Sequence, residues 1–307
     1  MKYFIVADVH GYYDELINIL KQAGFDKDNP NHTFVSLGNM LDRGYGVKEC
    51  LEFINSLNPD RCILIQGNHE VNMIAAFQRG GFIDGDISNG VITTIQSLTG
   101  LTDEQEGFKQ LKDSELLNQY LDQLQPYYET FYAVFIHGWI PCYYIRRLYS
   151  DTEMFYLYEP RWRDASDDDF CYATWLNGME AWNRGVREYD KTIICGNFPA
   201  AWGNYNLHKE GGEFKLDGTC NCPACVAQRQ QLNGFITLED SVPSDSPQYT
   251  PFRDDGIVNI EGGIAFGGVL NCLTWEDDPL ETMPIKKPKP VTPKKITFKG
   301  IMKKANG

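Results

Sequence analysis

The first seventy residues alternate between short apolar segments and longer segments with helical spacing. Three short segments have the pattern of strands: Lys2–Ala7 and Cys62–Gln66, which are mostly apolar, and His32–Leu37, which ends at Gly38. Between them, Tyr13–Ala23 and Lys48–Leu57 place their apolar residues along one face of a helix. The pattern predicts a β-α-β-α-β unit.

The rest of the chain continues this alternation less regularly. Residues 71–131 have a helical pattern broken by glycines, and residues 145–190, rich in Tyr, Trp and Arg, are expected to be helical with loops. Residues 204–256 have few periodic apolar positions, which indicates an irregular insertion. Further strands are expected at Ala133–Ile136, Thr192–Cys195, Ile257–Ile260 and Gly268–Trp275.

Polar clusters follow directly after several of the predicted strands. Ligands of open α/β sheets bind at the carboxyl ends of the strands, so this repeated placement predicts a site, although a single Asp-x-His pair is a weak signal. A carboxylate and an imidazole together suit Mn²⁺, Fe²⁺ or Zn²⁺. The clusters are Asp8-Val9-His10, Gly38-Asn39-Met40-Leu41-Asp42-Arg43-Gly44, Gly67-Asn68-His69-Glu70, His137-Gly138 and Gly196-Asn197.

Length and charge favour one acidic domain with a basic tail. The 307 residues carry a net charge of −14, but residues 281–307 contain eight Lys and one acid. We expect a single domain over residues 1–280 and a disordered Lys- and Pro-rich tail over residues 281–307. A body this acidic is a poor nucleic-acid binder, because phosphate backbones require clustered Lys and Arg.

The sequence argues against a membrane or secreted protein. It has no run of 18 apolar residues, so no transmembrane helix is expected. The nine cysteines are odd in number and irregularly spaced, and the N-terminus enters an apolar strand too short for a secretory leader. We therefore expect reduced thiols and a cytoplasmic protein.

On these motifs the sequence resembles the calcineurin-like metallophosphoesterase superfamily, nearest its Ser/Thr phosphoprotein phosphatase and diadenosine tetraphosphatase branch. The clusters at residues 8–10, 38–44 and 67–70 carry the resemblance, and Phe135-Ile136-His137-Gly138-Trp139-Ile140-Pro141 supports it. The resemblance implies an α/β (α+β) fold, a four-layered αββα sandwich with a helical insertion. It also implies hydrolysis of phosphomonoesters or nucleoside polyphosphates, with a phosphorylated protein or a nucleotide as substrate.

The resemblance also assigns roles to individual residues. Two divalent metal ions (Mn, Fe or Zn) would hold the attacking water, which lowers its pKa. His69 would be the general acid, kept protonated near neutral pH by Asp42, and Arg43 would clamp the phosphoryl group. The implied metal ligands are Asp8 and His10 for the first ion, Asn68, His137 and Asn197 for the second, and Asn39 at the bridge.

Several positions depart from the family pattern. Asn39 stands where the bridging carboxylate is expected, Asn197 where a ligating His is expected, and Pro199 and Glu261 also differ. An amide cannot neutralise a cation, so we expect reduced metal occupancy and hydrolysis slower by orders of magnitude, scaled from roughly 3 kcal/mol per missing electrostatic interaction. Near-isosteric Asn at two positions is typical of an engineered trap, whereas Pro199 and Glu261 suggest natural drift. The alternative function is a non-catalytic pseudo-phosphatase that binds a phosphorylated protein or nucleotide.

Two further features carry hypotheses. Cys220, Cys222 and Cys225 have the spacing of a partial structural zinc site, which needs a fourth ligand; the alternative is three unligated thiols in a loop. Arg163, in Arg161-Trp162-Arg163, is a candidate for substrate contact by resemblance to related phosphatases, and the alternative is a surface ion pair.

Overall fold

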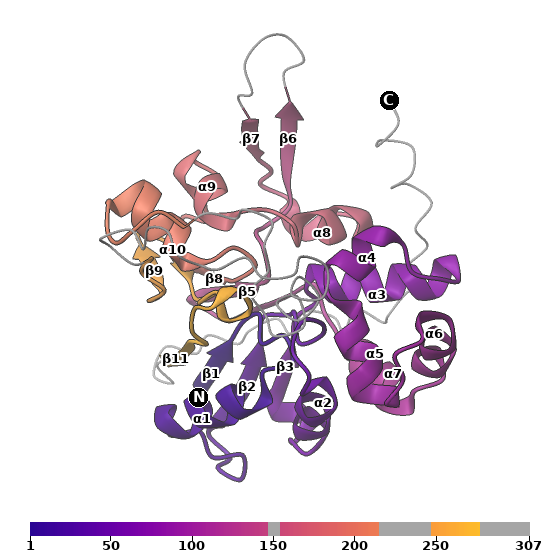
Figure 1. Ribbon diagram of the computed structural model, residues 1–307. Helices are drawn as coiled ribbons and strands as arrows, with labels where there is room; N and C mark the ends of the chain where they lie inside the picture. Colours follow the sequence, from indigo (N-terminus) through magenta and orange to yellow (C-terminus); the bar gives the residue numbers. More distant parts are fainter. Residues whose placement is uncertain (147–153, 215–246, 277–307) are drawn as a thin grey trace.

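The computed structural model describes residues 1–146, 154–214 and 247–276 and contains two β-sheets that pack face to face between helices (Figure 1). The expected four-layered αββα architecture is confirmed. One hydrophobic core lies between the two sheets, and each sheet packs a second core against its own helices.

The first sheet has the strand order β11-β1-β2-β3. Its three parallel strands, β1 (Lys2–Val6), β2 (His32–Ser36) and β3 (Cys62–Leu64), match the predicted segments, and β11 (Cys272–Glu276) pairs antiparallel with β1. The connections are α1 (Tyr13–Ala23), α2 (Val47–Asn55) and the short η1 (Pro59–Arg61).

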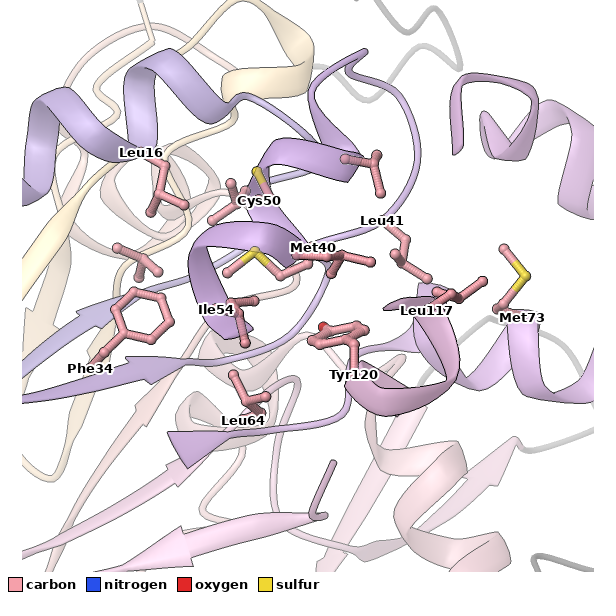
Figure 2. Close-up of a cluster of buried hydrophobic side chains, with 14 of the residues drawn as sticks. Leu16, Phe34, Met40, Leu41, Cys50, Ile54, Leu64, Met73, Leu117 and Tyr120 are labelled. Carbon is pink, nitrogen blue, oxygen red and sulfur yellow. The ribbon is translucent and has the colours of Figure 1, made fainter. Parts of the chain in front are cut away.

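Five helices follow β3 and share one buried hydrophobic cluster with α2, as the helical pattern of residues 71–131 predicts. Figure 2 shows Tyr120, Leu117 and Met73 from this group meeting Ile54 of α2 and Leu64 of β3 in one buried cluster. Burial of such side chains contributes about 1.5–3 kcal/mol each. The helices are α3 (Asn68–Arg79), α4 (Asp84–Ser88), α5 (Val91–Thr99), α6 (Glu104–Lys112) and α7 (Glu115–Leu121).

The second sheet has the order β4-β5-β8-β10-β9, with three parallel strands between two antiparallel edge strands. The strands are β4 (Tyr127–Glu129), β5 (Ala133–Ile136), β8 (Thr192–Cys195), β9 (Phe252–Asp254) and β10 (Ile257–Asn259). The helical segments of this half are η2 (Trp162–Asp164), α8 (Asp167–Ala173), α9 (Gly178–Asn183), α10 (Ala200–Gly203), η3 (Asn204–His208) and η4 (Ile264–Phe266).

Three regions differ from the sequence-based expectations. Strand β4 lies at the end of residues 71–131, where a helical pattern was expected. The segment expected to be helical with loops begins instead with a hairpin of β6 (Cys142–Arg146) and β7 (Met154–Tyr158), which projects from the body (Figure 1). The irregular stretch expected over residues 204–256 starts in η3 and ends in β9, so its ends are ordered. The tail over residues 281–307 lies outside the described residues. None of the described helices has the length and apolar character needed to span a bilayer.

Candidate active site

The carboxyl ends of the parallel strands of both sheets meet at one edge of the sandwich, and the candidate site residues lie there. Asp8 and His10 follow β1, Asn39 follows β2, and Asn68 and His69 open α3 after β3. The second sheet supplies residues after β5, β8 and β10: His137, Asn197 and Glu261. All but the half-buried Asn197 are buried. The sequence clusters are thus brought together as predicted.

The loops of this edge hold an unusual backbone. Six residues of the site are in the left-handed region, with φ between 51° and 70°: Asp8, His10, Asn39, Asp42, Arg43 and Asn197. Only one other non-glycine residue of the described chain, Lys209, has a positive φ. Such conformations carry strain of order 1 kcal/mol or more per residue and gather at functional sites. Gly38 is required here because a Cβ at this position would lie 2.5 Å from the backbone nitrogen of Gly67.

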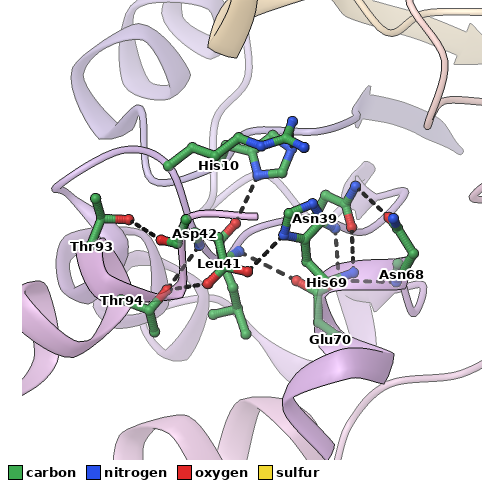
Figure 3. Close-up of polar contacts among 12 residues, drawn as sticks. His10, Asn39, Leu41, Asp42, Asn68, His69, Glu70, Thr93 and Thr94 are labelled. Atoms are coloured by element: carbon green, nitrogen blue, oxygen red, sulfur yellow. Dashed lines mark hydrogen bonds and ion pairs between the residues drawn. The ribbon is translucent and has the colours of Figure 1, made fainter. Parts of the chain in front are cut away.

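The Asn39 side chain lies at the centre of the site and is fully hydrogen-bonded. Its amide nitrogen Nδ2 donates to Asp8 Oδ1 at 2.8 Å. Figure 3 shows its other partners: Nδ2 donates to Asn68 Oδ1 at 2.9 Å, and the amide oxygen accepts from the backbone N–H of His69 at 3.1 Å. Flipping the amide would point its NH₂ group at the N–H donor of His69. The backbone of His69 therefore keeps nitrogen, which has no lone pair to give a metal, at the bridging position.

Glu70 organises the loop that carries Asn39, and the sequence motifs did not single out this role. Its buried carboxylate accepts backbone N–H groups from Gly67, Asn39, Met40 and Leu41 at 2.8–3.4 Å and the hydroxyl of Tyr120 at 3.2 Å. Burial raises the pKa of Glu70, and the N–H donors oppose that rise. The only sequence signal for this role is an acid three residues after a Gly, at the start of a predicted helix.

Asp42 and His69 form a buried pair. His69 Nδ1 lies 2.6 Å from Asp42 Oδ2, and Thr94 of α5 donates to Asp42 Oδ1 at 2.7 Å (Figure 3). Burial raises the pKa of Asp42 to about 7, while burial and the charge of Arg43 lower the pKa of His69. Burial thus opposes the expected protonation of His69, and its role as general acid stays a prediction. Asp42 and His69 therefore titrate together as a coupled pair.

Arg43 lies over the first half of the ligand set. Its guanidinium donates to His10 Nε2 at 3.0 Å, and His10 Nδ1 bonds the carbonyl of Leu41 at 2.8 Å. The guanidinium carbon also lies 4.9 Å from the ring centre of Phe266, a cation–π contact. Burial and the positive charge of Arg43 hold the pKa of His10 well below its usual value. His10 is thus neutral, and its Nε2 accepts a hydrogen bond from Arg43.

The second half of the ligand set is bonded internally. His137 Nδ1 lies 2.6 Å from the carbonyl of Leu37, and its Nε2 contacts Asn68 Oδ1 at 3.1 Å. Asn197 donates its backbone N–H to Asp8 Oδ2 at 2.9 Å but turns its side-chain amide to the carbonyl of Leu176 at 3.0 Å. The Asn197 backbone therefore belongs to the site, while its amide nitrogen points away from Asp8.

The remaining predicted residues have other surroundings. Arg163 makes bidentate contacts to Glu129 and further contacts to Glu188, and its guanidinium lies 4.3 Å from the ring centre of Trp162. These ion pairs account for Arg163 structurally, and substrate contact stays a prediction. Cys220, Cys222 and Cys225 lie outside the described residues.

Comparison with known proteins decides the family. The model of the family described as calcineurin-like phosphoesterase matches residues 1–216. The chain belongs to the calcineurin-like phosphoesterases. Its relatives include proteins named symmetrical bis(5'-nucleosyl)-tetraphosphatase, one from Salmonella arizonae, 36% identical with 90% of this chain and 92% of the relative covered, and one from Klebsiella pneumoniae, 27% identical with 94% and 96% covered. A solved structure described as a putative diadenosine tetraphosphatase is 14% identical, with a TM-score of 0.42 and 89% of each chain covered.

Calcineurin-like phosphoesterases are dinuclear metal enzymes, and the residues of this chain do not fit two bridged ions. No group of three His, Cys, Asp or Glu side chains converges as a metal site within the described part of the chain. The bridging position presents the nitrogen of Asn39, whose hydrogen bonds tie Asp8 to Asn68. Hydrogen bonds of the Asn39 amide thus join the two halves of the site.

Proposed function

We propose that this calcineurin-like phosphoesterase binds the phosphate chain of a nucleoside polyphosphate and hydrolyses it slowly or not at all. The Asn39 amide carries the proposal, because it donates hydrogen bonds where an active site needs a bridging anion. The relatives named symmetrical bis(5'-nucleosyl)-tetraphosphatase suggest the substrate class.

The residues that remain suited to phosphate are cationic or hydrogen-bond donors. The half-buried guanidinium of Arg43 can leave His10 Nε2 to bind phosphoryl oxygens, because the exchange replaces a neutral acceptor by an anionic one. Phe266 keeps that guanidinium at the site through its ring face. The Asp42–His69 contact orients the His69 ring beside the site, so that its other ring nitrogen can meet a ligand oxygen.

We also infer a cytoplasmic location. The six cysteines that the structure describes are free thiols, and burial raises the pKa of Cys50, Cys62, Cys142, Cys171, Cys195 and Cys272. Unpaired, unreactive thiols suit a reducing compartment.

The experiment compares binding with turnover. Calorimetric titration with diadenosine tetraphosphate measures binding to the unaltered chain and to Arg43→Ala, and chromatography of the products measures hydrolysis by the unaltered chain and by Asn39→Asp/Asn197→His in Mn²⁺. We expect binding that Arg43→Ala weakens, and turnover at least about 10³-fold slower in the unaltered chain than in the double variant. Equal turnover in both, or no binding to the unaltered chain, would overturn the proposal.

A further inference from the structure

Two loops at the edge that carries the candidate active site each hold one aromatic side chain in solvent. Tyr45 is 49% exposed and lies in the loop that leads from Arg43 into α2. Trp175 is 47% exposed and lies in the loop between α8 and α9. The first loop belongs to the half of the molecule built on the first sheet and the second loop to the other half. The function proposed above uses neither side chain.

The loop of Tyr45 is tied to the backbone of the site. Gly44 donates its N–H to the carbonyl of His10 at 2.8 Å, and Gly46 donates its N–H to the carbonyl of Gly11 at 2.9 Å. Tyr45 lies between these two glycines and follows Arg43 by two residues, so its side chain is the one that leaves the loop for solvent. Its ring therefore lies beside the arginine on a fixed backbone.

The loop of Trp175 is fixed in the same way to the strand ends of the second sheet. Ala173 accepts the N–H of Trp139, which follows β5, at 3.2 Å. Leu176 accepts the side-chain amide of Asn197, which follows β8, at 3.0 Å. The residues directly before and after Trp175 are buried, so the loop packs against the site and turns only the indole outward.

These two rings are distinguished by having no partner. Within the part of the chain that the structure describes, neither side chain has a hydrogen bond, an ion pair or a contact with another ring. The other exposed aromatic residues do interact: Phe131 with Tyr132, 4.7 Å between ring centres, Tyr189 with Tyr158 at 6.2 Å, and Tyr172. Exposed Trp and Tyr are enriched where proteins bind partners, because a flat ring offers a large contact area at little entropic cost. The unengaged rings are the two beside the candidate active site.

We propose that Tyr45 and Trp175 each stack one base of a dinucleoside polyphosphate, at opposite ends of the phosphate chain that Arg43 binds. The inference rests on the proposed function, which supplies the phosphate chain. Every base has a π-face, so an aromatic ring accepts any base without hydrogen-bond readout. Because each half of the molecule supplies one ring, a ligand with two bases engages both rings and a mononucleotide engages only one. The rings therefore select for a second base, not for its identity.

The test varies the number of bases while the phosphate chain stays constant. Calorimetric titration of the full chain compares inorganic tetraphosphate, adenosine tetraphosphate and diadenosine tetraphosphate. We expect the affinity of the unaltered chain to rise about tenfold with each base, and Tyr45→Ala and Trp175→Ala each to bind diadenosine tetraphosphate about tenfold more weakly. Inorganic tetraphosphate should bind both variants as it binds the unaltered chain.

Conservative and control variants separate stacking from a structural role of the loops. Tyr45→Phe and Trp175→Phe keep a ring and should retain most of the affinity for diadenosine tetraphosphate. Tyr189→Ala removes the most exposed aromatic ring of the described residues, 86% exposed, and should bind all three ligands unchanged.

Three outcomes would overturn the inference. Equal affinity of the unaltered chain for inorganic and diadenosine tetraphosphate would exclude base stacking but leave phosphate binding intact. Weaker binding of inorganic tetraphosphate by the alanine variants would show that the loops support the phosphate site instead. Binding of none of the three ligands would refute the proposed function, and the stacking with it.

Discussion

Replacing Asn39 by Asp makes the folded state depend on divalent cations. The substitution is nearly isosteric, but it places an oxygen where Nδ2 now donates to Asp8 Oδ1 and Asn68 Oδ1. Without a cation, three oxygens then converge on one buried point. The backbone N–H of His69 still satisfies the other oxygen at position 39, so the local rearrangement is confined to the bridge.

The magnitude follows from the two hydrogen bonds that the substitution breaks and the charge that it introduces. The hydrogen bond to the charged Asp8 is worth about 1.5–3 kcal/mol and that to the neutral Asn68 about 0.5–1.5 kcal/mol. Two carboxylates about 4 Å apart add repulsion of about 4 kcal/mol at an effective dielectric constant of 20, less if one takes up a proton. We therefore expect Asn39→Asp to lose at least about 3 kcal/mol in EDTA, a large part of the 5–15 kcal/mol that holds a typical domain.

Urea denaturation in EDTA and in saturating Mn²⁺ measures the effect. Mn²⁺ at 100 times its dissociation constant should return about 2.7 kcal/mol to the variant, more than the unaltered chain gains from the same Mn²⁺ concentration. The matched control is Asn204→Asp, because Asn204 is 3% exposed and donates Nδ2 to the carbonyls of Gln248 and Thr250. It should be destabilised equally with and without Mn²⁺. A loss below about 1 kcal/mol in EDTA, or a Mn²⁺ response no larger than that of Asn204→Asp, would refute the reasoning.

Three other substitutions test the site and its support. Thr94→Val removes a hydrogen bond that lowers the pKa of Asp42, so the pKa of Asp42 rises further in the variant. A buried acid with a raised folded-state pKa costs stability as pH rises from about 4 to about 7. In urea denaturation the variant should therefore be destabilised more at pH 8 than at pH 5. Glu70→Gln turns an NH₂ group toward backbone donors, and we expect a loss of about 3 kcal/mol or more in the same assay, with Asn39→Asp no longer responsive to Mn²⁺. Arg163→Ala leaves the buried carboxylate of Glu188 without its guanidinium, and we expect a melting temperature lower by several degrees with nucleotide binding unchanged in calorimetry, whereas lost binding in a folded variant would restore Arg163 as a substrate contact.

The sequence predicts the fold where apolar periodicity is strong. The segments around β1, α1, β2, α2 and β3 are found within one or two residues of their expected bounds, because each strand is a compact apolar run and each helix has one apolar face. The hairpin of β6 and β7 was missed because its strands are runs of aromatic and aliphatic residues without the polar alternation that marks a half-buried strand. β9 was missed because three residues at a sheet edge carry too little pattern to stand out.

For the site, the sequence predicts which residues gather but not what their atoms do. Asp8, Asn39 and Asn68 meet because parallel strands end at one edge. The orientation of the Asn39 amide depends on a backbone N–H thirty residues away, and Thr94 reaches Asp42 from across 52 residues. Such partners leave no local signal. The pKa of His69 depends on burial, which a motif does not encode.

The left-handed backbone at positions 39 and 197 favours asparagine over the residues that the family pattern expects there. Among residues with a side chain, Asn is one of the most tolerant of positive φ, and at positions 39 and 197 it also removes a charge or a bulky ring from a crowded interior. On the function proposed above, both residues favour the folded state at the expense of metal affinity. Whether the two asparagines arose by design or by drift, restoring the family residues is expected to lower the free energy of unfolding. In a chain without selection for turnover, these two residues would therefore be retained, because replacing them costs stability.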